Sequence, residues 1–190
     1  ARISYVGESG WEIYFNNNKD DGLALYDSLL EVGVVPVGIE TYANSRRLEK
    51  SFRLQGADLE TEYTAIEAAI QRPLVKEADF HGKAAHLAHR EEDPCAILCT
   101  MTLDDLNVSG KTRYPVGISP IIDPATGEVP IDSKGRRSYT TGMSYCPSLK
   151  KFVVMGYLPK EIAIQGKSLL IEYFNEDGDG LYPMTVQIVG

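Results

Sequence analysis

The sequence is short of basic residues, of cysteine and of long apolar runs, and each shortage excludes a class of protein. Its 190 residues carry 19 Lys and Arg against 27 Asp and Glu, a net charge of −8. This balance argues against a protein that coats nucleic acid, because phosphate binding needs clustered basic side chains. No run reaches the ~18 apolar residues of a membrane span. We therefore expect neither nucleic acid nor a membrane among its partners.

The few cysteines and histidines do not suggest a metal site. The three cysteines are an odd number without the density of a disulfide framework, so we predict reduced thiols and a cytoplasmic location. Cys95 and Cys99 lie four residues apart in an apolar run that predicts buried strand cysteines. His86 and His89 share one face of an expected helix, but no further ligand follows at a suitable spacing. The prediction is that no metal is bound.

What the sequence does contain is typical of a globular α+β protein, with 43% hydrophobic and 24% charged residues. Residues 2–6 and 12–15 predict two strands around a glycine turn at 7–10. A helix is expected from Asp20 or Asp21 to Gly33, because apolar residues recur on one face. The charge-rich stretch from Glu40 to Arg53 predicts a second helix with a solvated, salt-bridged face.

From Asp93 onward, short β-branched and aromatic segments alternate with glycine and proline turns. Strands are predicted at 151–158, 169–174 and 182–189, in an arrangement typical of a small β-barrel or a sandwich. We therefore predict an α+β region with a linking helix over residues 1–92. An all-β domain, a small C-terminal β-barrel, is predicted for residues 93–190.

The segment from Ser4 to Ile13 carries the residues best suited to bind a ligand. Two glycines, Gly7 and Gly10, bracket a bend flanked by Tyr5 and Glu12. A carboxylate accepts two parallel N–H donors from a guanidine-like ring edge, and an aromatic face stacks on the ring itself. On this pattern alone, a surface carboxylate on a strand is the ordinary interpretation of Glu12.

Four motifs in order resemble the aminomethyltransferase (T-protein) family of the glycine cleavage system. This family includes the folate-binding modules of dimethylglycine and sarcosine oxidising enzymes. The motifs are Tyr-x-Gly-Glu-x-Gly-x-Glu at 5–12, the stretch from Asn44 to Leu59 with Glu62–Glu67, Asp79-Phe-His-Gly-Lys-Ala, and Tyr145–Pro159. They cover nearly the whole chain.

The resemblance implies a fold and a site. The fold would be the second half of a folate-binding α+β domain followed by a small β-barrel, so we expect about half of a family enzyme, starting at a cut. Glu12 would bind the pterin of tetrahydrofolate, and Tyr5 would line the same pocket. The family's folate-binding Arg is missing from Thr41–Asn44, where Tyr42 is the nearest polar aromatic residue. The family's catalytic Asp lies outside this chain, so no catalytic residue is assigned.

The implied function is the transfer of a methylene or methyl group from a small-molecule donor to tetrahydrofolate. The chain would be the C-terminal part of such a transferase and would be inactive by itself. A lipoyl-carrier protein is a further expected partner. Two alternatives remain open: a non-catalytic folate-binding module, and the folate-binding tail of a dimethylglycine or sarcosine oxidising enzyme.

Overall fold

The computed structural model describes residues 1–16, 19–71, 74–103, 118–175 and 178–189. Its helices are α1 (Lys19–Glu31), the π-helix η1 (Glu40–Arg46), α2 (Arg47–Glu49) and α3 (Lys83–Glu91). Its strands are β1 (Ala96–Leu103), β2 (Ile121–Ile122), β3 (Thr140–Cys146), β4 (Lys151–Pro159), β5 (Ser168–Asn175) and β6 (Gly178–Val189). The three strands predicted in the C-terminal part are confirmed, with β6 beginning four residues earlier than expected.

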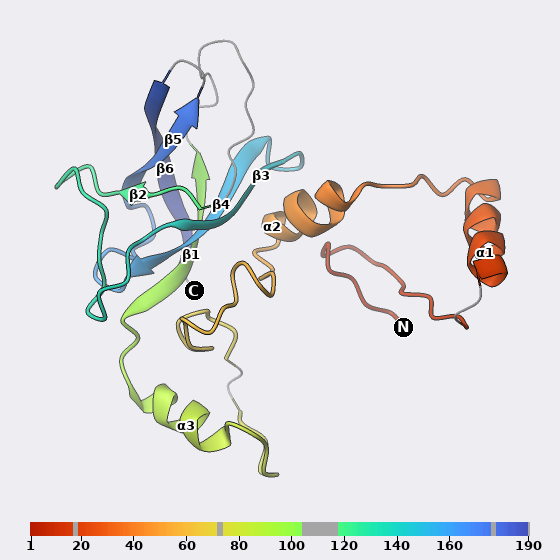
Figure 1. Ribbon diagram of the computed structural model, residues 1–190, viewed down its shortest axis with the longest axis horizontal. Coiled ribbons are helices and arrows are strands. Elements are labelled where there is room, and N and C mark those ends of the chain that lie inside the picture. Colours follow the sequence, from red (N-terminus) through yellow and green to blue (C-terminus); the bar gives the residue numbers. More distant parts are fainter. Residues whose placement is uncertain (17–18, 72–73, 104–117, 176–177, 190) are drawn as a thin grey trace.

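The six strands form one antiparallel sheet in the order β2-β5-β6-β1-β4-β3. The sheet curls, so that its two edge strands come together (Figure 1). Residues beside β2 pair with residues at the start of β3: Thr140 donates its N–H to the Ser119 carbonyl at 2.9 Å, and Pro120 forms a bridge with Tyr139. The chain is thus a mixed helix and strand protein built around a curled antiparallel sheet.

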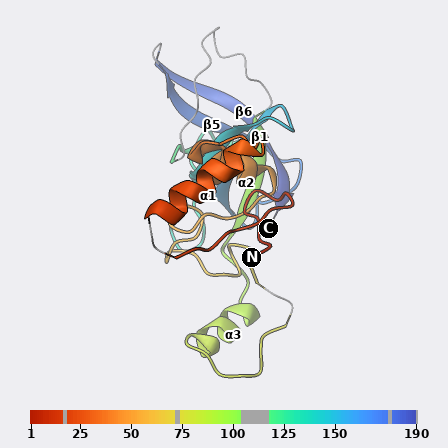
Figure 2. The ribbon, with the colours of Figure 1, turned by 90° about the vertical axis from the view of Figure 1, so that its right-hand side faces the viewer.

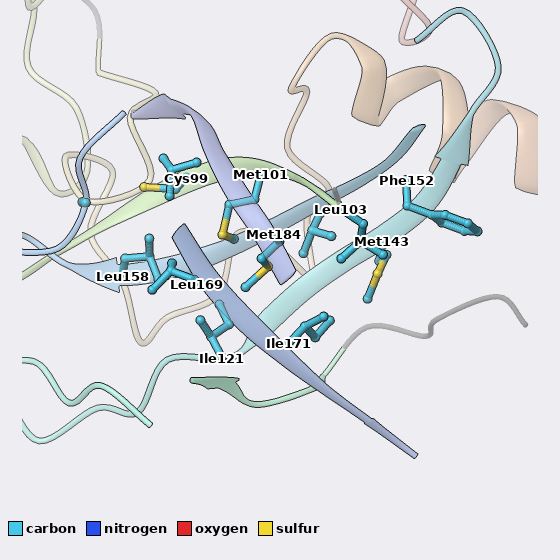
Figure 3. Packing of buried hydrophobic residues seen from close by; sticks show 13 residues of the cluster. Cys99, Met101, Leu103, Ile121, Met143, Phe152, Leu158, Leu169, Ile171 and Met184 are labelled. Atoms are coloured by element: carbon cyan, nitrogen blue, oxygen red, sulfur yellow. The ribbon is translucent and has the colours of Figure 1, made fainter. Parts of the chain in front are cut away.

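The inner face of the sheet holds the main hydrophobic core. Side chains from all six strands meet there, including Met101, Ile121, Leu158, Ile171 and Met184 (Figure 3). Alternate residues of β4 point to the two faces: Val154 and Leu158 belong to this core, whereas Val153 and Tyr157 pack on the outer face. Because both faces are covered, β4 is apolar from Phe152 onward instead of alternating with polar residues.

The outer face of β1, β3 and β4 is covered by residues 40–70. Leu48, Tyr63 and Ala68 pack there against Leu98, Met155 and neighbouring strand residues. The ring of Tyr63 stacks on Tyr157 with centroids 3.5 Å apart. The predicted boundary between residues 92 and 93 is therefore crossed by a shared hydrophobic cluster, and the segment that carries Tyr42 is anchored on the sheet.

The N-terminal part differs from the sequence prediction. The described residues 1–16 contain no strand. Two backbone hydrogen bonds join Ala1 to Glu12, and side-chain contacts of Tyr5 and Glu8 join the segment to residues 46–53. Helix α1 forms as predicted, but none of its residues is buried. Figure 1 places it far from the sheet along the long axis, and in Figure 2, viewed along that axis, it lies in front of the sheet. The prediction of two strands was wrong because no strand among the described residues lies beside this segment to supply the hydrogen bonds that an extended segment needs.

The second predicted helix is shorter and wound differently. It runs from Glu40 to Glu49 as η1 and α2, and ends where Ser51 adopts a positive φ of 55°. Helix α3 forms over the predicted linking segment and carries no buried residue.

Two of the excluded features can be checked within the described ranges. No helix there is long and apolar enough to cross a bilayer. Nor is there, among the described residues, a group of three or more His, Cys, Asp and Glu side chains that could hold a metal ion. Cys99 is buried in β1 as predicted, whereas Cys95 precedes the strand and is only partly buried.

Candidate functional site

Three aromatic rings meet beside the π-helix, and we call Tyr5, Tyr42 and Phe52 the aromatic cluster. The Tyr5 ring lies 5.6 Å from the Tyr42 ring at an angle of 47°, and 6.3 Å from the Phe52 ring in a stacked arrangement. Tyr42 is 40% exposed and Phe52 38% exposed, while Tyr5 is partly buried between them. The cluster therefore presents aromatic surface to solvent on a fixed base, which suits the stacking of a flat ring.

Backbone contacts fix the orientation of Tyr5. Its hydroxyl donates a hydrogen bond of 2.9 Å to the Arg53 carbonyl. Burial raises the pKa of Tyr5, an effect partly offset by the positive charge of Arg47 and reinforced by Asp58 and Tyr42. The phenol is thus neutral at pH 7 and remains a hydrogen-bond donor.

Glu12 lies on a second surface. Its carboxylate accepts a hydrogen bond of 2.5 Å from the Tyr14 hydroxyl, which raises the pKa of Tyr14. An open groove of about 750 Å³ runs beside it, lined by Ala1, Trp11, Glu12, Ile13, Tyr14, Leu29 and Val34. The groove is mainly apolar with one carboxylate at its wall, a combination that suits a largely flat ligand with an N–H edge.

The turn between Tyr5 and Glu12 is held against the helix that carries Tyr42. Gly7 has φ 72°, and a Cβ there would overlap the side chain of Lys50. Next to it, Glu8 pairs with Arg46 at 2.9 Å. Of the predicted residues, the structure brings Tyr5 and Tyr42 into contact and places Glu12 on a separate groove, with its carboxylate hydrogen-bonded to Tyr14.

A buried ion pair lies beneath the aromatic cluster. Arg47 is 1% exposed and its guanidinium pairs with Asp58, which is fully buried. Asp58 also accepts hydrogen bonds from the Thr141 hydroxyl and, at 2.8 Å, from the Leu54 N–H. The expectation of a solvated helix face was wrong for Arg47, because the next turn of chain folds over it and supplies the carboxylate.

A second buried ion pair lies elsewhere on the outer face of the sheet. Glu67 pairs with Arg136, whose guanidinium lies 4.3 Å from the centre of the Tyr63 ring. Burial raises the pKa of Glu67, but hydrogen bonds from Arg136 and from the Thr64 N–H outweigh that effect and lower it overall. Glu67 is therefore a carboxylate at neutral pH.

Sequence reasoning missed Phe52 and the burial of Arg47 and Asp58. The signal for Phe52 was its position within Leu48–Arg53, a motif already singled out. A stacked contact between residues 5 and 52 depends on how distant segments fold together, and no local pattern carries that information.

Comparison with known proteins shows which proteins this chain is similar to. Residues 1–77, which include Tyr5, Glu12 and Tyr42, match the family described as the GCVT N-terminal domain. The aminomethyltransferase of Francisella philomiragia is 31% identical over 180 residues, which are 90% of this chain and 45% of that protein. Residues 1–77 thus carry this family's domain, and most of the chain is similar to an aminomethyltransferase.

Two further comparisons agree with this similarity. Rat mitochondrial dimethylglycine dehydrogenase is 31% identical over 194 residues, which are 97% of the chain and 20% of that protein. The crystal structure of the glycine cleavage system aminomethyltransferase T from Bartonella henselae shares its fold with a TM-score of 0.69 at 22% identity. That match covers 89% of the chain and 43% of the other protein. The chain thus spans between one fifth and just under half of the length of these relatives.

Proposed function

We propose that the chain is the C-terminal part of a tetrahydrofolate-dependent one-carbon transferase and that it holds the pterin of the folate. The observation that carries this proposal is the Glu12 carboxylate on the wall of an apolar groove, beside a turn that leads to the aromatic cluster. Both features lie within the residues that match the family. A pterin has a flat ring and a guanidine-like edge, so it needs these two kinds of contact.

The residues present fit tetrahydrofolate. Glu12 would accept hydrogen bonds from the pterin edge, and Trp11 and Tyr14 supply aromatic surface in the same groove. Tyr5 and Tyr42 would extend this surface next to the turn. When bound, tetrahydrofolate supplies the nitrogen that accepts the one-carbon unit. The chain's own residues bind and orient it, and exclude water from its ring faces.

The chain's contribution on its own is binding. We propose that it does not turn over substrate alone, because none of its residues is assigned as the acid–base group of the transfer. The one-carbon donor is a small molecule in this proposal. A lipoyl-carrier protein remains a predicted partner, although a net charge of −8 disfavours an acidic one.

A second candidate function is the folate-binding tail of a dimethylglycine dehydrogenase-like enzyme. The match to the rat enzyme covers 97% of this chain, against 90% for the Francisella aminomethyltransferase. Residues 41–44 contain no Arg, and this departure from the aminomethyltransferase pattern also favours the second candidate. A covalently or tightly bound flavin in the full-length protein would favour this candidate, and a colourless full-length protein would contradict it.

We also propose that the curled sheet closes into the small C-terminal barrel. The supporting contacts are those that join its edges, between Ser119 and Thr140 and between Pro120 and Tyr139. The two-domain division at residues 92 and 93 is proposed because all the described strands lie after it, with residues 40–70 as the part of the first domain that packs on the barrel.

Trp11 provides a direct test of folate binding. It is the only tryptophan in the sequence, is 73% exposed and lines the groove with Glu12. Titration with tetrahydrofolate should change its fluorescence in a saturable manner, after correction with free tryptophan amide at the same absorbance. A change no larger than that of the free amide would contradict the proposed function.

A further inference from the structure

Arg47 touches the backbone of both segments that bring Tyr42 and Phe52 to Tyr5. Its Nε donates a hydrogen bond of 2.8 Å to the carbonyl of Ala43, the residue after Tyr42. Its Nη1 donates a hydrogen bond of 3.0 Å to the carbonyl of Phe52. One buried guanidinium therefore spans the gap between the π-helix and the loop that follows α2.

The guanidinium is itself fixed from the side of the sheet. Asp58 accepts from Nη1, and the sulfur of Met155 lies 3.6 Å from the same nitrogen. On β3, a Cβ added to Gly142 would lie only 2.7 Å from Nη2, so a side chain there would push directly on Arg47. Because the guanidinium group is rigid and planar, a shift of one of its nitrogens moves the other two.

The segment from Ser51 to Arg53 is constrained at each residue. Ser51 has a positive φ of 55°, and its hydroxyl accepts a hydrogen bond of 3.0 Å from Thr100. The Phe52 carbonyl is bound by Arg47, and the Arg53 carbonyl by the Tyr5 hydroxyl. A non-glycine residue with positive φ is conformationally strained and stays so only where its surroundings determine it. The strain occurs directly before Phe52, the residue on which Tyr5 stacks.

We propose that Arg47 is a positioning residue for the aromatic cluster: it sets the spacing of Tyr42 and Phe52, and thereby the surface offered to the bound ligand. The proposal rests on the folate-binding function proposed above, which supplies the ligand. Arg47 acts through the backbone of Ala43 and Phe52 and contacts no ligand itself.

The test combines two variants with a matched control. Arg47→Lys keeps the charge opposite Asp58 but cannot bridge both carbonyls, since an ammonium lacks the planar fork. Gly142→Ala keeps the arginine itself, but the added Cβ pushes on its Nη2 from the side of β3. The control is Glu67→Gln, which breaks the other buried ion pair on the same face of the sheet without touching the cluster.

Two readouts are measured for each variant at a temperature where it is fully folded. The first is the set of nuclear Overhauser effects between the Tyr5 ring and the rings of Tyr42 and Phe52, without ligand. The second is the dissociation constant for tetrahydrofolate. We expect both variants at positions 47 and 142 to weaken the ring contacts and to raise the dissociation constant at least tenfold, with the control close to wild type.

If the variants at positions 47 and 142 change the ring contacts and the affinity no more than Glu67→Gln does, the positioning role is overturned. Arg47 would then be a purely structural residue. A wild-type protein that does not bind tetrahydrofolate would overturn the proposed function instead. In that case the ring contacts alone decide whether Arg47 positions the cluster.

Discussion

At the scale of single residues, the buried charges lie where separate segments join the sheet. Asp58 and Glu67 come from the loops after α2, and each faces an arginine on the outer face of the sheet. A buried carboxylate left without its arginine is strongly destabilising, by about 3–5 kcal/mol. These ion pairs therefore hold residues 40–70, which include Tyr42 and Phe52, on the sheet.

The lowered pKa of Glu67 predicts how the stability of the protein depends on pH. Its folded-state pKa is lower than that of an unfolded glutamate, ~4.3, so its stabilisation is complete above that value and is lost as the pH falls through the lowered pKa. Glu67→Gln should unfold at lower urea concentration than wild type at pH 7, and the difference should shrink below about pH 4. Urea unfolding between pH 7 and pH 3 measures this.

The control for this prediction is Glu161→Gln, which removes the same charge from an exposed position. Its unfolding midpoint should follow that of wild type at every pH. A difference between Glu67→Gln and wild type that does not change with pH would contradict the assigned role of the carboxylate.

Individual site residues were predictable only where a motif carried them. Tyr5, Glu12 and Tyr42 follow from the resemblance to a family, and Tyr5 and Tyr42 do lie together in space. Glu12 lies on a separate groove with Trp11 and Tyr14. Neither the stacking of Tyr5 on Phe52 nor the burial of Arg47 could be predicted, because both arise from contacts between segments far apart in sequence.

At the scale of elements, prediction succeeded for strands whose residues pack on both faces and failed for segments without a partner. The apolar run in β4 is long enough to indicate a strand whatever its surroundings. Residues 2–6 and 12–15 have a similar alternation, but none of the strands in the described part of the chain pairs with them, so they stay irregular. The π-helix from Glu40 was also outside local prediction, since its winding accompanies the packing of Arg47 beneath it.

Gly156 in β4 provides a test of how tightly the sheet is packed. A Cβ there would lie 2.7 Å from the Tyr139 carbonyl oxygen and 2.9 Å from Cδ1 of Ile121. Gly156→Ala should therefore lower the free energy of unfolding by about 1–3 kcal/mol, as overpacked cores do. Chemical denaturation of both proteins at one pH gives the value.

Gly38→Ala is the matched control, because no heavy atom lies within 4 Å of a Cβ at that exposed position. It should leave stability unchanged or raise it by up to about 1 kcal/mol. Equal stability of Gly156→Ala and wild type would show that the strands around β4 are farther apart than described.

At the scale of the whole molecule, the chain divides into a well-packed sheet and an exposed N-terminal part. The core and the cluster on the outer face involve residues 48–186, whereas α1 has no buried residue. Large apolar side chains are exposed along residues 1–39, including Trp11, Tyr14, Val32, Val35 and Ile39. Stability is therefore expected to be distributed unevenly along the chain.

Amide hydrogen exchange should reveal this distribution. Amides of β1, which is paired on both sides by β4 and β6, should exchange at least about a hundredfold more slowly than those of α1, a difference of about 3 kcal/mol in opening free energy. Exchange followed by mass spectrometry of peptic peptides resolves both elements. Protection of α1 equal to that of β1 would contradict the description.

The central claim is that Glu12 holds the pterin of tetrahydrofolate, and one comparison tests it most directly. The Trp11 titration is repeated on Glu12→Gln, with Glu161→Gln as a control of equal charge. Loss of a charge-assisted contact worth about 2–4 kcal/mol predicts a dissociation constant about 30- to 1000-fold higher for Glu12→Gln and an unchanged value for the control. Equal affinity of Glu12→Gln and wild type would contradict the account.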